Sequence, residues 1–475
     1  MKGGRNLFKV KIENSILPAF QGENLREFLI KNGFYINSPC GGNGTCGKCT
    51  VTVNGERVKS CCYSISSDIS VVIPEKEEIL SSRKVAEIVK YTNDNNDIVL
   101  CLDIGTSTLA LAKISKSDGK ALKVVTKTNA QRVFGADVIS RIDYCKKNSV
   151  TPLKEALINQ INIMLEEIEA SKPYTLFVSG NTCMLHFLFG KDASSLGAYP
   201  YTPVFLESQT VSGEALGLKS VTEVISLPCI SAFVGADLTA GLSVVDKPKN
   251  NKYNILVDLG TNAEILLFSK DKLLCTSAAA GPCFEGGNIS CGMSASYGAI
   301  YSFSIDGNGN KEYKTIGNSS PEGVSGTALF DIVAELLKEN IIDETGYMSK
   351  EDFKITENVS FSQKDVRQFQ LAKSAVHSAI TTLMKLENIS FDDIEALYIS
   401  GGFSQELNIK NAIFTGLLPK EAEEKIKTLN NTSLSGTIKF ALDGKNPLDE
   451  FKSIKYIDLS ANPDFSESFI NNMDF

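Results

Sequence analysis

The sequence predicts a small α+β module followed by a much larger α/β module. Three observations lead to this prediction. Four regularly spaced cysteines lie within the first 61 residues, the motif D-x-G-T occurs twice between apolar strands, and a later strand ends in Gly-Gly. A chain of 475 residues is too long for one ordinary hydrophobic core, so two or three domains are expected.

Alternating apolar residues and turn signals give the elements of the small module. In chain order we expect a strand at 7–14, a short helix at 24–31, a strand at 50–53, a return strand that ends at Cys61 and a last strand at 69–73. Gly33 suits the end of the helix, and Asn54-Gly55 is a strong signal for a hairpin turn. This hairpin carries Cys61 back towards the other cysteines.

The cysteine motif predicts the chemistry of this module. Cys40, Cys46, Cys49 and Cys61 have the spacing C-x5-C-x2-C-x11-C. Three thiolates on a glycine-rich loop and a fourth from further along the chain suit a [2Fe–2S] cluster, because glycines let the backbone wrap closely around the sulfurs. The alternative is a zinc site with four cysteine ligands, but such sites seldom have a glycine-rich x5 loop.

The order strand, helix, cysteine loop and hairpin resembles the β-grasp ferredoxin fold. The x11 spacing is similar to the [2Fe–2S] domains of molybdenum hydroxylases, and the x5 spacing is similar to adrenodoxin-type ferredoxins. In such modules the fourth ligand precedes an aspartate at the last strand by about seven residues, as Cys61 precedes Asp68, so Cys61 is preferred to Cys62. We expect this domain to span residues 1–75.

Residues 76–97 are polar and rich in turn formers, which predicts a linker. A flexible linker would let an electron carrier swing between donor and acceptor. A plain solvated connector is the alternative.

The repeated D-x-G-T motif predicts a nucleotide site in the large module, residues 98–475. Each copy joins two apolar strands, so the two copies form an internal repeat. The glycine permits a tight turn, while backbone N–H groups and hydroxyls face phosphates. Asp103 and Asp258, at the strand ends, are placed to hold Mg²⁺. The expected phosphate contacts are Gly105, Thr106, Ser107, Thr108, Gly260, Thr261 and Asn262.

A strand at 394–400 delivers Gly401, Gly402 and Phe403, where a nucleoside can approach the backbone closely. With the two repeats, it resembles the superfamily of acetate and sugar kinases, heat-shock ATPases and actin (ASKHA). That resemblance implies an actin-like fold of two ribonuclease-H-like subdomains around a nucleotide cleft, with their boundary near residue 250.

Composition limits the function classes. The net charge is −8 with dispersed basic residues, which argues against a nucleic-acid partner. No apolar run approaches about 18 residues and no apolar signal core opens the chain, so we expect no membrane span and a cytoplasmic protein. Twelve scattered cysteines favour a reducing, anaerobic cytoplasm, and two histidines exclude a three-histidine metal site.

Several strings identify a narrower resemblance. They are Q-R-V-F-G-A-D-V-I-S-R at 131–141, S-G-N-T-C-M-L-H at 179–186, A-A-G-P-C-F-E-G-G-N-I-S-C-G-M at 279–293, Q-L-A-K-S-A-V from Gln370 and G-L-L-P at 416–419. Together with the cysteine module they resemble the reductive activators of corrinoid-dependent methyltransferases. The better-known members have a longer region between the two modules, which leaves the reach of the cluster and any dimer contact open.

The resemblance implies an ATPase that reduces inactive Co(II) to Co(I) in a corrinoid protein of a methyltransferase system. The electron would come from an upstream low-potential donor through the [2Fe–2S] cluster. ATP is needed because ferredoxin-type clusters lie near about −400 mV while Co(II)/Co(I) lies lower. A homodimer is also suggested, and Glu285 could touch the ribose or adenine, or simply begin a structural helix.

Three other functions compete with this interpretation. A small-molecule kinase with a redox ferredoxin domain would need a base, for which Asp237 is the best candidate. The chain could instead activate another low-potential enzyme, or act as an ATP-switched scaffold. The roles of His186, His377 and of Cys283 with Cys291, which could share a second cluster across a dimer, are left open.

Overall fold

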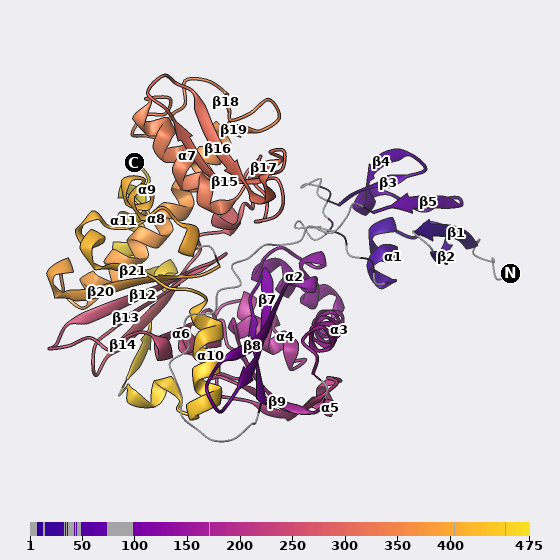
Figure 1. Ribbon diagram of the computed structural model, residues 1–475, viewed down its shortest axis with the longest axis horizontal. Coiled ribbons are helices and arrows are strands. Elements are labelled where there is room, and N and C mark those ends of the chain that lie inside the picture. Colours follow the sequence, from indigo (N-terminus) through magenta and orange to yellow (C-terminus); the bar gives the residue numbers. More distant parts are fainter. Residues whose placement is uncertain are drawn as a thin grey trace.

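The computed structural model describes residues 7–12, 15–32, 34, 36, 42, 44, 49–73, 98–170, 172–402, 404–451 and 453–475. Three large sheets organise the described residues, one in the N-terminal module and one in each lobe of the large module, and two smaller sheets accompany them (Figure 1). Cys40, Cys46, Phe403, Gly33 and the predicted linker lie outside the described residues.

The N-terminal module is a five-stranded sheet with one helix. Its strands are β1 (Leu7–Ile12), β2 (Ser15–Phe20), β3 (Thr50–Val53), β4 (Glu56–Lys59) and β5 (Ile69–Val72), in the order β2-β1-β5-β3-β4, and its helix is α1 (Leu25–Lys31). β1 runs parallel to β5, and the predicted Asn54-Gly55 hairpin joins β3 to β4. β2 was not predicted, because Pro18 interrupts its strand pattern.

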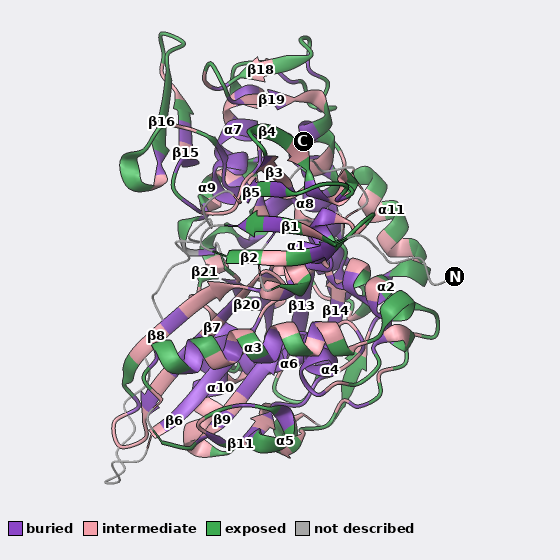
Figure 2. Cartoon of the chain, turned by 90° about the vertical axis from the view of Figure 1, so that its right-hand side faces the viewer, coloured by how far each residue is buried: buried purple, intermediate pink, exposed green. Residues whose placement is uncertain are grey.

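The first lobe contains a six-stranded sheet in the order β10-β11-β9-β6-β7-β8. The strands are β6 (Ile98–Ile104), β7 (Thr108–Ser115), β8 (Ala121–Thr128), β9 (Tyr174–Gly180), β10 (Thr210–Ser212) and β11 (Val221–Ser226). The helices are α2 (Val138–Asn148), α3 (Thr151–Glu167), α4 (Thr182–Leu188), α5 (Gly213–Leu216) and α6 (Ala236–Val244). α3 is buried on the side that faces its sheet and exposed on the other (Figure 2).

The second lobe repeats this plan in the order β21-β20-β12-β13-β14-β22. The strands are β12 (Tyr253–Leu259), β13 (Ala263–Phe268), β14 (Leu273–Ala278), β20 (Ile394–Ser400), β21 (Ile426–Thr428) and β22 (Ile454–Tyr456). In both lobes an antiparallel three-strand meander is extended by a parallel strand, β9 beside β6 and β20 beside β12. The two D-x-G-T motifs therefore occupy equivalent hairpins.

Further elements surround the second sheet. They are α7 (Gly326–Lys338), α8 (Gln363–Leu386), α9 (Ile409–Phe414), α10 (Thr432–Asp443), α11 (Pro463–Asn471), β15 (Ala299–Ile305), β16 (Lys311–Thr315), β17 (Gly323–Val324), β18 (Asp352–Lys354) and β19 (Ser360–Ser362). The predicted helix at 362–386 is confirmed as α8, capped by Ser362 and Asp365. β15 to β19 form a separate region at the top of the molecule (Figure 1), which was not predicted.

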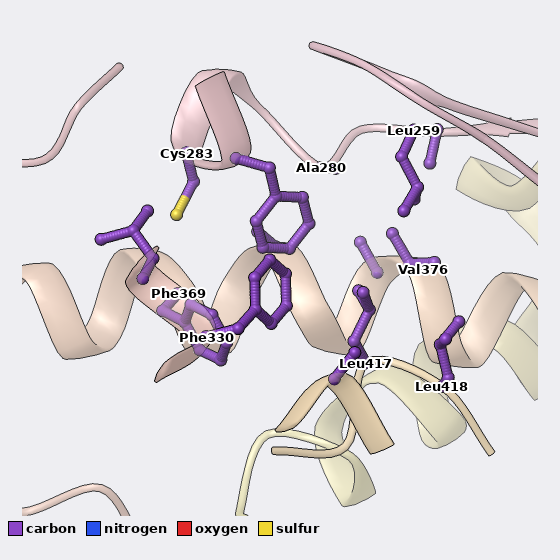
Figure 3. Packing of buried hydrophobic residues seen from close by; sticks show 14 of the residues in the cluster. Leu259, Ala280, Cys283, Phe330, Phe369, Val376, Leu417 and Leu418 are labelled. Carbon is purple, nitrogen blue, oxygen red and sulfur yellow. The ribbon is translucent and has the colours of Figure 1, made fainter. Parts of the chain in front are cut away.

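The largest hydrophobic core lies between the second sheet and α7 and α8. Phe284, Phe330 and Phe369 pack against one another there, with ring centroids 5.0–5.9 Å apart. Cys283 points into the same core (Figure 3) and is 2% exposed. This burial makes Cys283 a packing residue and disfavours a cluster shared with another chain.

Candidate functional site

The two D-x-G-T turns are tight hairpins, which we call phosphate loop 1 (residues 103–108) and phosphate loop 2 (residues 258–262). In loop 1 the Gly105 N–H donates to the Thr108 carbonyl at 2.9 Å, and in loop 2 the Gly260 N–H donates to the Asn262 carbonyl at 3.0 Å. A Cβ atom on Gly105 would lie 2.7 Å from the Thr108 carbonyl oxygen, so loop 1 requires glycine there.

Glu285 connects the two loops. Its Oε2 atom accepts hydrogen bonds from the Ser107 hydroxyl and from the Thr261 hydroxyl, both at 2.8 Å. Glu285 ends the 3₁₀ turn η4 (Pro282–Glu285), which follows β14 and packs on α7 and α8. The structure thus brings together two predicted phosphate contacts and places a carboxylate between them. A contact of Glu285 with ribose or adenine stays a prediction.

The predicted magnesium ligands lie at the ends of β6 and β12 and are held by residues that sequence reasoning missed. Asp103 accepts hydrogen bonds from Asn431 Nδ2 at 2.8 Å and from Ser433 Oγ at 2.7 Å. Asp258 accepts one from Ser400 Oγ at 3.4 Å. Asn431 caps α10 and Ser433 lies in its first turn, more than 300 residues from Asp103, so no local pattern marks this contact.

A cluster of buried carboxyls surrounds this position. Burial, with the negative charges of Asp237 and Asp103, raises the pKa of Asp258 to about 7. Burial, with the charge of Asp103, raises the pKa of Asp237 to about 7. Glu264 on β13 is 8% exposed, and burial with the charges of Asp237 and Asp258 raises its pKa well above the ordinary value. A divalent cation beside Asp103 and Asp258 would offset the negative charge of these carboxyls.

Phosphate loop 1 rests on buried polar side chains from Asn129 and from the 131–141 string that follows it. The Asn129 side chain donates to the Gly105 carbonyl at 2.8 Å, and Arg141 Nη2 donates to the Thr106 carbonyl at 2.6 Å. Arg141 is fully buried and also donates to the Gly135 carbonyl and to Gln131 Oε1. The string singled out in the sequence therefore positions the loop from beneath.

The Gly-Gly segment follows β20 as predicted and meets phosphate loop 2. Gly401 has φ +117°, and a Cβ atom there would lie 2.1 Å from the Leu259 carbonyl oxygen. At Gly402, by contrast, a Cβ atom would meet nothing within 4 Å. The backbone at Gly402 is thus open to a ligand. The nucleoside contact predicted for Phe403 lies outside the described residues.

Two of the predicted cluster ligands are described, and they lie side by side. Cys49 Sγ and Cys61 Sγ are 3.2 Å apart, and the exposed Cys62 has its Sγ 3.7 Å from that of Cys61. Burial and the neighbouring thiols raise the pKa of Cys61 to about 12, so a bound metal must displace its proton. Among described residues, no three His, Cys, Asp or Glu side chains are grouped to hold a metal ion.

The ring nitrogens of both histidines contact backbone groups. His186 is fully buried and stacks on Phe205, with Nδ1 at 2.8 Å from the Thr182 carbonyl and Nε2 accepting from the Val204 N–H at 3.0 Å. His377 Nδ1 lies 3.1 Å from the Gly416 carbonyl. Nδ1 of His186 thus contacts the first turn of α4, and Nε2 holds α4 to the following segment at Val204.

Comparisons with known proteins identify the family of this chain. Residues 98–249 match the family model described as the RACo middle region, and residues 252–475 match the C-terminal domain of RACo, the ASKHA domain. The corrinoid activation enzyme RamQ of Eubacterium limosum is 28% identical over 84% of this chain and 74% of its own length. The [Co(II) methylated amine-specific corrinoid protein] reductase of Methanosarcina barkeri is 27% identical over 74% of this chain and 71% of its own.

A solved reductive activator for corrinoid, iron-sulfur protein has the same fold, with a TM-score of 0.71 over 98% of both chains at 24% identity. None of the helices in the described part of the chain combines the length and hydrophobicity that a bilayer span requires. The two family models together cover most of the chain, with the nucleotide loops divided between them. The chain belongs to the family of reductive activators of corrinoid enzymes.

Proposed function

We propose that this protein restores an inactive corrinoid protein by an ATP-dependent, one-electron reduction of Co(II) to Co(I). One observation carries the nucleotide part of the proposal. Two equivalent hairpins meet at Glu285, with Asp103 and Asp258 at their bases and an acidic cluster that a cation can neutralise. This is the arrangement expected of a Mg·ATP site.

In the proposed site, Asp103 and Asp258 would hold Mg²⁺, directly or through water. Hydroxyls and backbone N–H groups of the two phosphate loops bind the phosphates, and Gly401, Gly402 and Phe403 approach the nucleoside. Asn431 and Ser433 orient Asp103 by donating to both of its oxygens. Because Ser107 and Thr261 share one acceptor, binding of phosphates at either loop changes the surroundings of the other.

The N-terminal module, residues 1–75, is proposed to be a β-grasp ferredoxin domain that binds a [2Fe–2S] cluster through Cys40, Cys46, Cys49 and Cys61. The adjacent sulfurs of Cys49 and Cys61, 3.2 Å apart, fit a shared cluster. When bound, the cluster supplies one-electron transfer near about −400 mV. Residues 76–97 link this domain to the ATPase domain, 98–475, whose lobes divide near residue 250.

The role of ATP follows from the potentials. Moving one electron uphill by about 100 mV costs about 2.3 kcal/mol. Binding and hydrolysis of ATP can supply this by closing the two lobes in one state and opening them in another, which favours one complex with the corrinoid protein over the other. The four cysteines would hold the cluster that carries the electron. A low-potential donor would lose one electron, Co(II) would gain it to become Co(I), and water would hydrolyse ATP.

The test is anaerobic. The reduced protein, Mg·ATP and a Co(II) corrinoid protein are mixed, and the absorbance of Co(I) is followed. We expect Co(I) only when ATP is present. A failure to form Co(I) with any corrinoid partner, accompanied by steady phosphorylation of a metabolite, would favour the kinase alternative.

That alternative has one observation in its favour. Burial raises the pKa of Asp237 to about 7, which suits a general base at neutral pH. Replacing Asp237 by Asn would then abolish phosphoryl transfer to the metabolite. A corrinoid activator would phosphorylate no metabolite, either before or after Asp237→Asn.

A further inference from the structure

Arg26 of the N-terminal module reaches out of its own domain. It lies on α1, is 6% exposed, and its Nη2 atom donates to the carbonyl of Val133 in the first lobe. The same guanidinium lies against the cysteine loop, because a Cβ atom on Gly42 would be 3.0 Å from Nη1. One buried side chain therefore touches both the loop that carries the cysteines and the large module.

Other contacts of α1 fall on the same surface of the lobe. Ile30 packs against the hydrophobic core of the first lobe. Tyr144 on α2 is within electrostatic reach of Arg26 and Glu27, and its ring packs on that of Phe134 at 4.7 Å. The docking surface of α1 is thus formed by α2 and by the 3₁₀ turn η2 (Ala130–Val133).

The N-terminal end of η2 contacts phosphate loop 1. Asn129 caps η2 by accepting from the Gln131 N–H, while its Nδ2 donates to Gly105 and its N–H donates to the Ser107 carbonyl. Arg141, on α2, holds the Thr106 carbonyl. A continuous set of contacts therefore runs from Gly42 through Arg26, Val133 and Asn129 to the loop that binds phosphate.

We propose that docking of the N-terminal module on η2 and nucleotide binding at phosphate loop 1 are thermodynamically coupled, with Arg26 as the positioning residue. This inference rests on the proposed function, since it takes loop 1 as a phosphate site. A buried guanidinium needs a hydrogen-bond acceptor. A nucleotide that shifts loop 1 and η2 therefore changes the strength of the hydrogen bond between Arg26 and the Val133 carbonyl. By reciprocity, release of α1 changes nucleotide affinity by the same factor. The nucleotide state would then set when the electron carrier leaves the ATPase surface.

Hydrogen–deuterium exchange on the full-length holoprotein tests the coupling, with and without Mg²⁺ and a non-hydrolysable ATP analogue. We expect amides in α1 and η2 to change their exchange rate by about fivefold or more when the analogue binds. In Arg26→Gln the change in α1 should disappear while that in loop 1 persists. Lys31→Gln removes an exposed charge from the same helix and should behave like the wild type.

The outcomes separate the inference from the proposed function. If loop 1 becomes protected but α1 of the wild type does not respond, the coupling is overturned and the nucleotide site stands. If loop 1 itself does not respond, both fail. Should Arg26→Gln lose its visible iron–sulfur absorption, Ile30→Ser replaces it, because that change weakens the apolar contact of α1 with the first lobe. A nucleotide response of α1 that survives in this variant also overturns the coupling.

Discussion

At the scale of single residues, Glu285 joins the two phosphate loops. Its carboxylate binds two hydroxyls that phosphate oxygens would otherwise engage. A negative charge at this position opposes a triphosphate at short range. The residue is therefore expected to restrain nucleotide binding and to hold the two loops together in its absence.

We predict that Glu285→Gln binds Mg·ATP about tenfold more tightly, a difference of about 1.4 kcal/mol, because the repulsion is removed while a hydrogen-bonding side chain remains. Isothermal titration calorimetry measures this directly. Weaker binding would contradict the prediction and would favour the contact with ribose or adenine that the sequence first indicated.

Asp258 gives a prediction about pH. Its pKa of about 7 means that the carboxyl is largely protonated at pH 6, and a cation must displace that proton. Binding of Mg·ADP should therefore release up to about one proton per carboxyl at pH 6 and few at pH 8, with the affinity rising over this interval. Calorimetry in buffers of different ionisation enthalpy counts the protons, and Asp258→Asn should release fewer. A count that does not vary with pH would argue against cation binding by this carboxyl.

The raised pKa of Asp258 also affects the free energy of unfolding in the absence of a cation. The folded-state pKa lies above the value of about 3.8 expected in the unfolded chain, so the folded state keeps the proton longer. Stability is therefore fully present below about pH 4 for this group and falls as the pH rises towards 7. Mg²⁺ with nucleotide should offset the loss at the upper end of this range.

At the scale of elements, α10 connects the two lobes at the site. The helix packs on α6 and against β6 and β9 of the first lobe. At its N-terminus Ser433 binds Asp103, while Thr432 Oγ1 lies 2.5 Å from Ser400 Oγ, which in turn binds Asp258. The N-terminal end of α10 thus contacts Asp103 directly and Asp258 through Ser400.

We predict that Ser433→Ala raises the Mg²⁺ concentration needed for half-maximal ATPase activity by a few-fold and lowers the free energy of unfolding by about 1 kcal/mol. The hydroxyl is one of two donors to Asp103, so Asp103 is left partly unsatisfied. Ser435→Ala is the matched control, because that hydroxyl bonds only to the Asn431 carbonyl within α10 among the contacts described. Equal Mg²⁺ dependence in both variants would show that Ser433 does not orient Asp103.

These elements also show what the sequence could predict. The hairpins of the phosphate loops, the Asn54-Gly55 turn and α8 follow from local periodicity and turn chemistry, and the structure contains all of them. Asn431 and Ser433 were missed because their function depends on a contact with Asp103, which no local pattern records. Glu264 looked like an ordinary strand residue, and only the packing of β13 places it beside the aspartates. The roles of Cys40, Cys46 and Phe403 stay predictions.

At the scale of the whole molecule, the chain combines a paired-thiol module with a two-lobed nucleotide fold, and the proposed function assigns electron transfer to the first and nucleotide binding to the second. We predict that Cys61→Ser abolishes the iron–sulfur absorption and Co(II) reduction but leaves the affinity for Mg·ATP within about twofold. The nucleotide loops make no described contact with Cys61, and the variant keeps Arg26 and Ile30, which dock α1 on the first lobe. Cys62→Ser is the control, because Cys62 is the neighbouring exposed cysteine that was not chosen as the fourth ligand.

Asp258→Ala should show the opposite pattern, keeping the cluster spectrum while losing ATP-dependent Co(I) formation by more than about tenfold. Removing one carboxyl from a cluster of like charges relieves repulsion, so the variant is expected to fold. Visible absorption, nucleotide calorimetry and anaerobic Co(I) formation are measured on each variant. If Cys62→Ser rather than Cys61→Ser loses the iron–sulfur absorption, the fourth ligand is assigned wrongly. The separate roles of the two modules would still stand. If Asp258→Ala still forms Co(I) in response to ATP, reduction does not depend on the proposed magnesium site, and the link between the two modules must be sought elsewhere.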